Sequence, residues 1–442
     1  MTTTYAGRMT STALLTDRYE LTMIDAALRS GNHDTPCVFE LFARRLPSGR
    51  RYGVVAGTGR LLDAITEFRF GPSELAALKR DEVVSAEALD WLEAYRFAGE
   101  IRGYREGELY FPGSPLLVVE AGFAEGVVLE TLALSMLNYD SAVASAAARM
   151  VSAAAGRPLA EMGSRRTGEH SAVAAARAAY IAGFHATSNL EAGRSWGVPT
   201  MGTAAHAFTL LFPDEEQAFR AQVASLGTGT TLLVDTYDIR TGVEHAVRAA
   251  GTELGAVRID SGDLGVVVRE VRAQLDALGA TGTRITVTND LDEHAIAALA
   301  SAPVDSYGVG TALVTGSGAP AAGMVYKLVA RRDAAGSWVA VGKSSEGKAT
   351  IGGRKQPVRA LQDGMAISED IHVEDPPVEA LAADAGRLLH VPLVTAGEPA
   401  GDALGPNGAA AARAHHARAI AELPAEGLRL SRGEPAIPTR YL

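Results

Sequence analysis

The sequence predicts an α/β protein built around a parallel β/α barrel, because strand-like runs and helix-like segments alternate in its centre. Helix-like segments such as 265–278 and 292–300 separate the runs, so the order is strand, loop and helix, repeated. In parallel arrays of this kind, polar residues at strand ends converge on the face where ligands bind. Each of the four apolar runs ends in a polar, glycine-bearing or acidic turn, at 232–238, 257–263, 285–290 and 307–311.

The barrel domain is assigned to residues 121–330. Two alanine-rich segments with helical character, 131–155 and 169–182, precede the four strands. Together these elements are enough for most of an irregular, TIM-like barrel, whose usual size is roughly 250 residues. A chain of 442 residues also has room for one or two further domains.

An additional α+β domain is expected from the segments that flank the barrel. Residues 1–120 contain a predicted helix at 16–29 and strands such as 38–42 and 116–119. We expect this N-terminal domain to be completed by the chain that follows the barrel.

The segment after the barrel starts with a predicted hairpin, formed by 325–330 and 338–341 across a glycine-bearing turn. Residues 331–375 are therefore assigned to the N-terminal domain. Residues 376–442, rich in Pro, Ala and Gly, are expected to form a C-terminal extension of loops around a helix at 409–423.

Composition excludes several classes of protein. The formal net charge of −11 argues against nucleic-acid binding, which requires a basic surface. The single cysteine, Cys37, excludes an internal disulfide and fits a reducing compartment. The chain has no apolar run approaching the roughly 18 residues of a membrane span, and 1–12 has no apolar signal core. We therefore expect a cytoplasmic globular protein.

The strand end at 257–263 carries the clearest pair of candidate ligands. Arg258 and Asp260 alternate with apolar residues, so both side chains point to one face of the sheet. A guanidinium suits a carboxylate or phosphate, and an aspartate suits a ribose diol. The alternative is a self-satisfied ion pair at a strand end. The acidic loop 261–263 favours the functional interpretation.

The other strand ends, and two motifs upstream, are less specific by themselves. Residues 289–290 and 308–311 offer the small side chains and backbone N–H groups that hold phosphates, although turns need glycine for other reasons. Residues 163–170 place two arginines before a helix, either as a phosphate clamp or as a solvated turn. His206 lies among small residues in 202–208, a setting that alone decides nothing.

Taken together, these blocks resemble the nicotinate phosphoribosyltransferase family over roughly residues 13–360. The resemblance implies that nicotinate and 5-phosphoribosyl-1-pyrophosphate are converted to nicotinate mononucleotide and pyrophosphate in NAD salvage. It also implies ATP hydrolysis through a phosphorylated histidine, magnesium, and a homodimer with shared active sites. The motifs that carry it occur in the family's order, at 15–23, 163–166, 187–189, 202–206, 258–263, 289–292 and 308–311.

The resemblance implies the following catalytic roles. His206 matches the phosphohistidine, and Asp235 would orient its ring. Arg258 would pair with the nicotinate carboxylate, and Asp260 would bind the ribose hydroxyls.

The resemblance also implies binding residues. Tyr19 would stack on the pyridine, from the same or a neighbouring subunit, and Thr203 would meet the nicotinate carboxylate. The 5-phosphate site would be lined by Asn289, Gly308, Gly310 and Thr311. Further implied substrate or pyrophosphate contacts are Arg165, Arg44 or Arg45, Ser188 and Asn189, and the basic loops add the nucleotide or pyrophosphate candidates Lys343, Lys348 and Lys355.

Two departures and three alternatives stand beside this interpretation. Met162 occupies a position where relatives often have an aromatic residue, and the chain after 375 carries no family motif. A nicotinamide-specific enzyme would need an acidic residue near Ser188 or Asn189, and a quinolinate enzyme a larger cationic cluster. From another class, the chain could be a catalytically lapsed nucleotide-binding barrel. The presence of His206, Asp235, Arg258 and Asp260 argues against this alternative.

Overall fold

The computed structural model describes residues 11–343, 350–373, 381 and 386–442, which form two compact units. Unit 1 comprises Met1–Ala142 and Ala321–Leu442, and unit 2 comprises Val143–Pro320. The sequence analysis placed these divisions after residues 120 and 330. Each unit is described by itself below.

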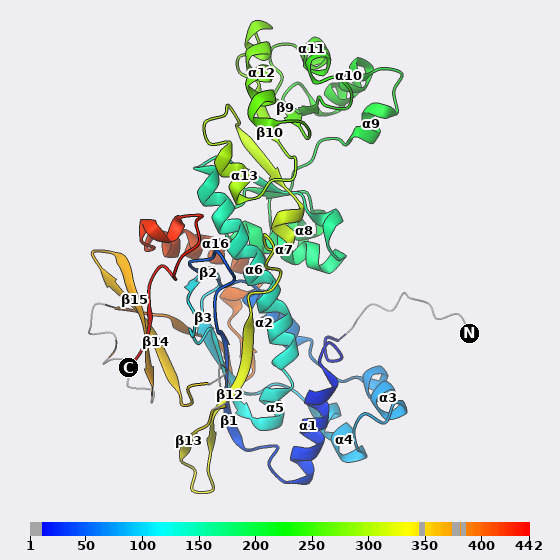
Figure 1. Ribbon diagram of the computed structural model, residues 1–442. Helices are drawn as coiled ribbons and strands as arrows, with labels where there is room; N and C mark the ends of the chain where they lie inside the picture. The colour runs from blue at the N-terminus through cyan, green and yellow to red at the C-terminus, as the bar shows by residue number, and fades with distance from the viewer. Residues whose placement is uncertain (1–10, 344–349, 374–380, 382–385) are drawn as a thin grey trace. The chain divides into compact units, whose positions relative to one another are not determined.

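Unit 2 contains a six-stranded parallel sheet in the order β7-β6-β11-β10-β9-β8 (Figure 1). All four predicted strands are present. The sheet has two edges, at β7 and β8, so among the described residues strand pairing does not close a barrel. The strands are β6 (Leu159–Glu161), β7 (Ala186–Thr187), β8 (Thr231–Leu233), β9 (Ala256–Ile259), β10 (Arg284–Val287) and β11 (Ser306–Val309).

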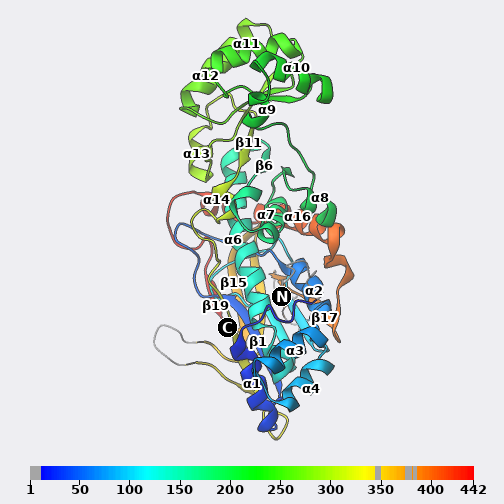
Figure 2. The same cartoon turned by 90° about the vertical axis from the view of Figure 1, so that its right-hand side faces the viewer.

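Helices alternate with these strands as the sequence predicts. α10, α11 and α12 are neighbours, which Figures 1 and 2 both show. α12 buries Val268, Val271 and Leu275 on one face, the i, i+3, i+7 spacing of an amphipathic helix. The helices are α7 (Glu169–Ile181), α8 (Leu190–Trp196), α9 (His206–Leu210), α10 (Glu215–Leu226), α11 (Ile239–Ala250), α12 (Leu264–Ala277), α13 (Glu293–Ala298) and α14 (Thr311–Val314), with the 3-10 turn η1 (Ser164–Arg166).

Several polar residues at the strand ends of unit 2 are helix caps. The side chains of Asp238, Asp263 and Asp292 accept backbone N–H groups in the first turns of α11, α12 and α13. Such caps satisfy donors that have no partner within the helix. The functional interpretation of the acidic loop 261–263 is therefore corrected in part. Asp263 caps the start of α12, and Gly262 has a left-handed φ of 82°.

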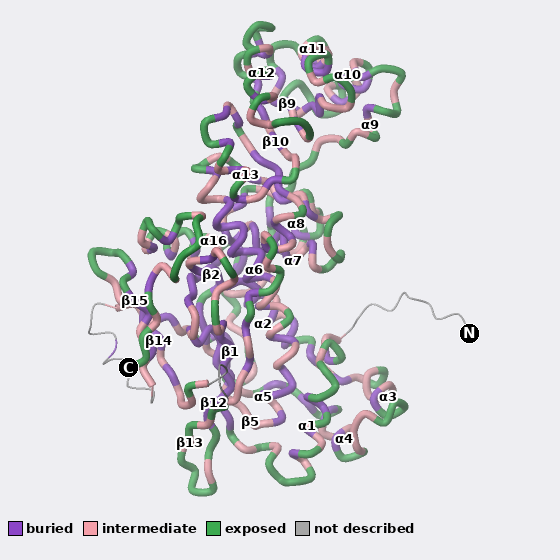
Figure 3. The backbone as a smooth tube through the Cα atoms, in the orientation of Figure 1, coloured by how far each residue is buried: buried purple, intermediate pink, exposed green. Residues whose placement is uncertain are grey.

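Unit 1 is built on a seven-stranded antiparallel sheet in the order β13-β12-β1-β5-β3-β17-β18. Figure 3 shows β1 mostly buried, in agreement with its burial pattern. The predicted hairpin is present as β12 and β13. The strands of this sheet are β1 (Pro36–Ala43), β3 (Glu100–Tyr104), β5 (Leu117–Gly122), β12 (Met324–Arg332), β13 (Trp338–Ala340), β17 (His390–Thr395) and β18 (Glu398–Pro399).

Two smaller sheets and the remaining helices complete unit 1. The four-stranded sheet has the order β16-β14-β15-β19, and β2 pairs with β4. The strands are β2 (Gly53–Val54), β4 (Leu109–Tyr110), β14 (Lys355–Gln362), β15 (Met365–Val373), β16 (Gly386–Leu388) and β19 (Thr439–Tyr441). The helices are α1 (Arg18–Arg29), α2 (Thr58–Thr66), α3 (Pro72–Arg80), α4 (Ala86–Ala94), α5 (Phe123–Val127) and α16 (Gly405–Ala421), with 3-10 turns η2 (Gly401–Ala403) and η3 (Ala425–Leu428); α6 (Glu130–Ala154) contains the first unit boundary.

The chain after residue 375 differs from the predicted helical and loop extension. It supplies β17 to the large sheet, beside β3, and β16 and β19 to the four-stranded sheet. These strands are three to six residues long and pair with strands from earlier parts of the chain. Local periodicity therefore does not show them.

A buried ionic network connects early and late segments of unit 1. Arg359 and Glu369 are fully buried and paired at 2.6 Å. Tyr104 donates to Glu369 at 2.8 Å, and Arg387 and His415 both contact Glu108. Each buried charge of this network has an opposite charge beside it, which offsets the free-energy cost of removing it from water.

Glu20 fixes the start of α1, the helix that carries Tyr19. Its buried carboxylate accepts the N–H and hydroxyl of Thr131 at 2.8 and 2.7 Å and the N–H of Asp17 at 3.0 Å. Burial outweighs these bonds and raises the pKa of Glu20 to about 7.

Because the folded state then holds a proton that the unfolded state releases, stability falls as pH rises from about 4.5 to 7. Replacing Glu20 by Gln removes this proton linkage. We expect the unfolding free energy of the wild type to fall by about 2 kcal/mol more than that of Glu20→Gln when the pH is raised from 5 to 8. Urea unfolding at several pH values measures it. Glu74, at the same position of α3 but only partly buried, provides the control substitution Glu74→Gln. Equal pH slopes for the wild type and Glu20→Gln would contradict the prediction.

Candidate active site

His206 and Asp235 lie together in unit 2, as the sequence analysis expected of a histidine and its partner. His206 is the first residue of α9, and its Nδ1 is 3.1 Å from the Thr236 hydroxyl. Its Nε2 is 3.9 Å from Oδ1 of Asp235, whose side chain is 1% exposed against 42% for the histidine. The imidazole is therefore open on one side and faces a buried carboxylate on the other.

Asp235 also organises the neighbouring strand end. Its Oδ2 accepts the backbone N–H of Asp260 at 2.9 Å and the hydroxyl of Ser261 at 2.6 Å. Its Oδ1 is buried without a hydrogen-bond donor. A buried acceptor of this kind favours a donor in reach, so the tautomer of His206 with a proton on Nε2 suits the site.

Arg258 is held by three separate partners. Its Nε donates to Thr288 at 3.2 Å, its Nη1 to the carbonyl of Ala204 at 3.2 Å, and its Nη2 contacts Asp260 at 3.4 Å. Ala204 belongs to the loop before His206, so Arg258 links this loop to β9. A guanidinium has five N–H donors, and those not used here remain for a ligand.

Arg258, Thr203 and Met162 all line one cavity of about 250 Å³ inside unit 2. The cavity runs along β9 and β10 as far as their amino ends, and Arg284 is one of its lining residues there. The structure thus brings the two predicted carboxylate contacts, Arg258 and Thr203, to one cavity. Met162, the departure from the family pattern, lines the same cavity.

Glu161, which the sequence analysis did not select, joins the strand ends of β6 and β7. Its carboxylate accepts the N–H of Gly163 and, at 2.5 Å, the hydroxyl of Thr187. Thr187 in turn accepts the N–H of Asn189 at 2.9 Å. Burial raises the pKa of Glu161. The only sequence signal was an acid at the end of a three-residue strand.

Two predicted contacts on these loops have structural partners. Asn189 caps α8 through its Oδ1 and donates to Ser164 at 3.0 Å. The N–H of Ser188 binds the carbonyl of Glu161 at 2.8 Å, and its side chain is exposed. Arg165 is exposed in the turn η1 of the same loop region.

The predicted phosphate residues lie after β10 and within or just after β11. Asn289 is half-buried after β10, and Gly310 precedes α14, which begins at the exposed Thr311. Gly308 is buried, and a Cβ at this position would lie 2.7 Å from both Met162 Sδ and Thr288 Cγ2. Only glycine fits between β6, β10 and β11 at this point.

The remaining candidates belong to unit 1. Tyr19 is 45% exposed on α1, and burial with nearby Glu130 raises its pKa to about 12. Arg44 lines a cavity of about 240 Å³ together with Lys355, and Arg45 is exposed. Lys355 is 2% exposed and paired with Glu40, so the interpretation of Lys355 as a free cation for nucleotide is corrected. Lys343 is exposed, and Lys348 lies outside the described residues.

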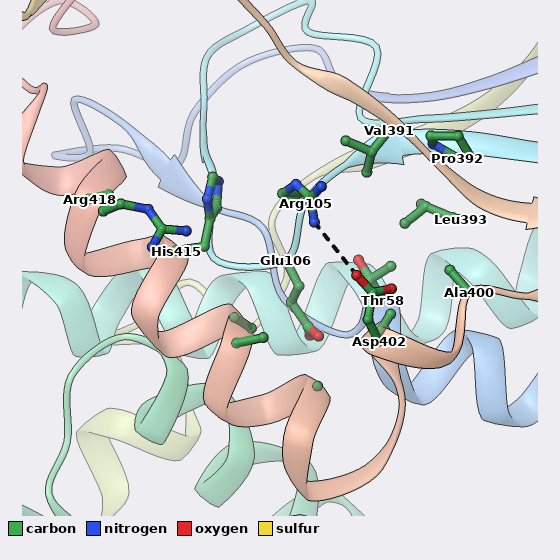
Figure 4. Close-up of a pocket in the computed structure, with 14 residues that line it drawn as sticks. Thr58, Arg105, Glu106, Val391, Pro392, Leu393, Ala400, Asp402, His415 and Arg418 are labelled. Carbon is green, nitrogen blue, oxygen red and sulfur yellow. Dashed lines mark ion pairs between the residues drawn. The ribbon is translucent and has the colours of Figure 1, made fainter.

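A further cavity of about 270 Å³ in unit 1 contains none of the predicted site residues (Figure 4). Several of its charged side chains have partners within the unit. Arg105 lies 4.0 Å from Asp402, and Glu106 accepts the N–H groups of Gly57 and Gly59 at the start of α2. This cavity is separate from the network around Arg258.

The described part of the chain contains neither a metal-ligand cluster nor a membrane-spanning helix. Within residues 11–343, 350–373, 381 and 386–442, no three His, Cys, Asp or Glu side chains are grouped so as to hold a metal ion. Within the same ranges, no helix has the length and apolar character needed to span a membrane.

Comparison with known proteins decides the family. Residues 14–138 match the family model of the nicotinate phosphoribosyltransferase (NAPRTase) N-terminal domain. The chain is 59% identical to nicotinate phosphoribosyltransferase pncB1 of Mycobacterium tuberculosis, over 97% of this chain and 95% of that protein. The chain belongs to the nicotinate phosphoribosyltransferase family.

Two other members of the nicotinate phosphoribosyltransferase family agree in sequence and fold. The Bacillus subtilis enzyme is 36% identical, over 84% of this chain and 77% of that protein. The crystal structure of human nicotinic acid phosphoribosyltransferase superposes with a TM-score of 0.79 at 25% identity and covers 96% of this chain and 97% of that one. The α/β fold is therefore that of the family.

The close approach at Gly308 yields a prediction for this nicotinate phosphoribosyltransferase family member. In Gly308→Ala the new methyl displaces Met162 or Thr288, at a cost of about 1–3 kcal/mol. Because Met162 lines the cavity with Arg258, we also expect weaker binding of a small aromatic acid. Chemical unfolding and calorimetric titration measure the two effects. In the control Gly282→Ala the methyl meets open space, and a loss of stability equal to that of Gly308→Ala would contradict the packing argument.

Proposed function

We propose that this chain is an enzyme that joins nicotinate to 5-phosphoribosyl-1-pyrophosphate and releases nicotinate mononucleotide and pyrophosphate. The family assignment supports this reaction. The single observation that carries it to residues is that Arg258 and Thr203 line one cavity, with Asp260 two residues beyond Arg258 on the same face of the strand end. In this arrangement an aromatic carboxylate meets a cation at one end, and a ribose meets a carboxylate at the other.

The chemistry requires positioning rather than proton transfer. The pyridine nitrogen attacks C1 of the ribose, forming the N–C bond while the bond from C1 to the pyrophosphate oxygen breaks. The pyridine nitrogen is a neutral nucleophile, so no general base is needed to create it. Fixed charges that stabilise the ribosyl centre and the leaving group supply the catalysis. Arg258 orients the acid and Asp260 holds the ribose hydroxyls.

The phosphate groups are assigned to the remaining strand ends. Asn289, Gly308, Gly310 and Thr311 would bind the 5-phosphate, and Arg165 the pyrophosphate. Ser188 and Asn189 would line the same substrate. Support comes from their position after β7 and β10, at the end of β11 and in the loop after β6, all at the carboxyl ends of one parallel sheet.

Magnesium and ATP are part of the proposal. Mg²⁺ binds substrate phosphates and one or two carboxylates rather than a protein cage, which suits a described chain without a cluster of three ligands. Asp260, whose side chain is 32% exposed, is the carboxylate that would share it. When bound, the ion offsets the charge of the pyrophosphate.

His206 is proposed as the acceptor of the γ-phosphoryl group of ATP. A bond from an imidazole nitrogen to phosphorus forms, ADP leaves, and water later releases phosphate. The support is the half-exposed ring, with Asp235 beside Nε2 and Thr236 beside Nδ1. Asp235 would orient the imidazole and stabilise its positive charge.

The assembly is also proposed. We take the six-stranded sheet to be part of an irregular, TIM-like barrel, since all its pairs are parallel and a parallel bridge between Thr187 and Thr200 continues beyond β7. The protein would act as a homodimer with shared sites, to which Tyr19, Arg44 and the exposed Lys343 contribute. Mixed dimers of Tyr19→Ala and Arg258→Ala chains that regain activity would support shared sites.

The reaction is tested with purified protein, phosphoribosyl pyrophosphate and Mg²⁺, offered nicotinate, nicotinamide or quinolinate with and without ATP. We expect product from nicotinate, with the other two pyridines at least about tenfold poorer, because each leaves a charge unpaired in the site. Product from nicotinamide but not from nicotinate would favour the nicotinamide alternative. No product from any pyridine would favour a lapsed enzyme.

Arg258→Ala is expected to raise the KM for nicotinate by about 10- to 100-fold, the value of a charge-assisted contact. Steady-state kinetics at saturating phosphoribosyl pyrophosphate measures it. Arg284→Ala is the matched control, since Arg284 lines the same cavity at the amino end of β10. An unchanged KM in Arg258→Ala would place the carboxylate elsewhere.

His206→Ala is expected to bring the ratio of rates with and without ATP to about one, because the phosphoryl acceptor is gone. It should also abolish acid-labile, base-stable labelling by γ-labelled ATP. The control is His294→Ala, an exposed histidine of α13 in the same unit. Full ATP stimulation of His206→Ala would remove the phosphohistidine assignment.

A further inference from the structure

Arg258 and Asp260 carry opposite charges on the same face of one strand end, yet they do not form a tight pair. The structure gives one contact between them, from Nη2 to Oδ2 at 3.4 Å. A relaxed guanidinium–carboxylate pair has bonds of about 2.7–2.9 Å and is often bidentate. The Arg258 side chain is only 15% exposed, so little water surrounds the guanidinium. Another group must therefore hold this spacing.

Thr288 is that group. Its hydroxyl accepts from Nε of Arg258 at 3.2 Å and donates to Oδ1 of Asp260 at 2.7 Å. The Thr288 hydroxyl oxygen thus binds Nε of Arg258 and Oδ1 of Asp260. A bidentate pair would join these two atoms directly. Both the accepting and the donating capacity of the hydroxyl are needed.

The position of Thr288 is fixed on both sides. Its backbone N–H binds the carbonyl of Ile259 at 3.0 Å, which continues the pairing of β10 with β9. Its methyl group points toward β11, where a Cβ on Gly308 would approach it to 2.7 Å. The hydroxyl cannot turn away unless the packing against β11 changes. Arg258 is held from a further side by the carbonyl of Ala204.

We propose that Thr288 is a positioning residue that keeps Arg258 and Asp260 from closing into a short, bidentate pair. The spacing leaves guanidinium donors for an aromatic carboxylate and carboxylate oxygens for ribose hydroxyls. Without the hydroxyl, the guanidinium and the carboxylate close into a direct pair, and each ligand must compete with that pair. This inference rests on the proposed function, since it uses the roles of Arg258 and Asp260 stated there.

Three variants test the proposal. Thr288→Val removes the hydroxyl and keeps the shape, Thr288→Ser keeps the hydroxyl and removes the methyl, and Thr283→Val is the control. Thr283 precedes β10, is 1% exposed and has a hydroxyl without a hydrogen-bond partner. For Thr288→Val we expect the KM values of both nicotinate and phosphoribosyl pyrophosphate to rise about tenfold, with kcat within about threefold, the pattern of lost ground-state binding.

The serine variant distinguishes positioning from packing. Thr288→Ser is expected to stay within about threefold of wild type in both KM values, because its hydroxyl makes the same two bonds. A merely structural role predicts instead that Thr288→Val and Thr288→Ser lower the thermal midpoint together and leave both KM values unchanged. That result would overturn the proposal, as would equal KM changes in Thr283→Val.

A crystal structure of Thr288→Val tests the spacing without any assay. We expect the distance between the Arg258 guanidinium and the Asp260 carboxylate to shorten from 3.4 Å to about 2.8 Å. An unchanged spacing would overturn the proposal whatever the kinetics. If wild-type protein converts no pyridine while the pair closes in this crystal, the proposed function fails and the positioning role of Thr288 stands.

Discussion

The candidate site depends on the buried carboxylate of Asp235. One of its oxygens accepts the Asp260 N–H and the Ser261 hydroxyl, which fixes the turn that follows β9. The other has no donor and faces His206. A buried charge with one satisfied and one open oxygen costs free energy unless a partner approaches. The same constraint therefore sets the turn at Asp260 and Ser261 and gives the histidine ring a preferred orientation.

Sequence alone located most of unit 2, because its signals are local. Alternation of Val257 and Ile259 with Arg258 and Asp260 correctly gave a half-polar strand end. The pattern could not separate ligand groups from caps: Asp263 resembles Asp260 in sequence but binds the first turn of α12. Thr288 and Glu161 were missed for a related reason. Their importance lies in contacts with other strands, and nothing in their own neighbourhood shows it.

Unit 1 was harder to predict, since its pairings join distant residues. β17 lies beside β3, almost 290 residues earlier, with His390 opposite Tyr104. Lys355 shows the same limit for side chains. In sequence it belongs to a basic loop, but the structure buries it against Glu40. A charge run becomes an anion site only where the fold leaves its cations unpaired, and this depends on which acids the sheet brings near.

The spacing of charges is the property that separates the site from the buried network of unit 1. In that network Arg359 meets Glu369 at 2.6 Å, and both side chains are fully buried. In the site, Arg258 and Asp260 stay 3.4 Å apart with a hydroxyl between them. A reaction with a neutral nucleophile needs fixed charges more than it needs acids and bases. Charges that form a tight pair cannot provide this, so the proposed reaction requires the incomplete pairing of Arg258 and Asp260.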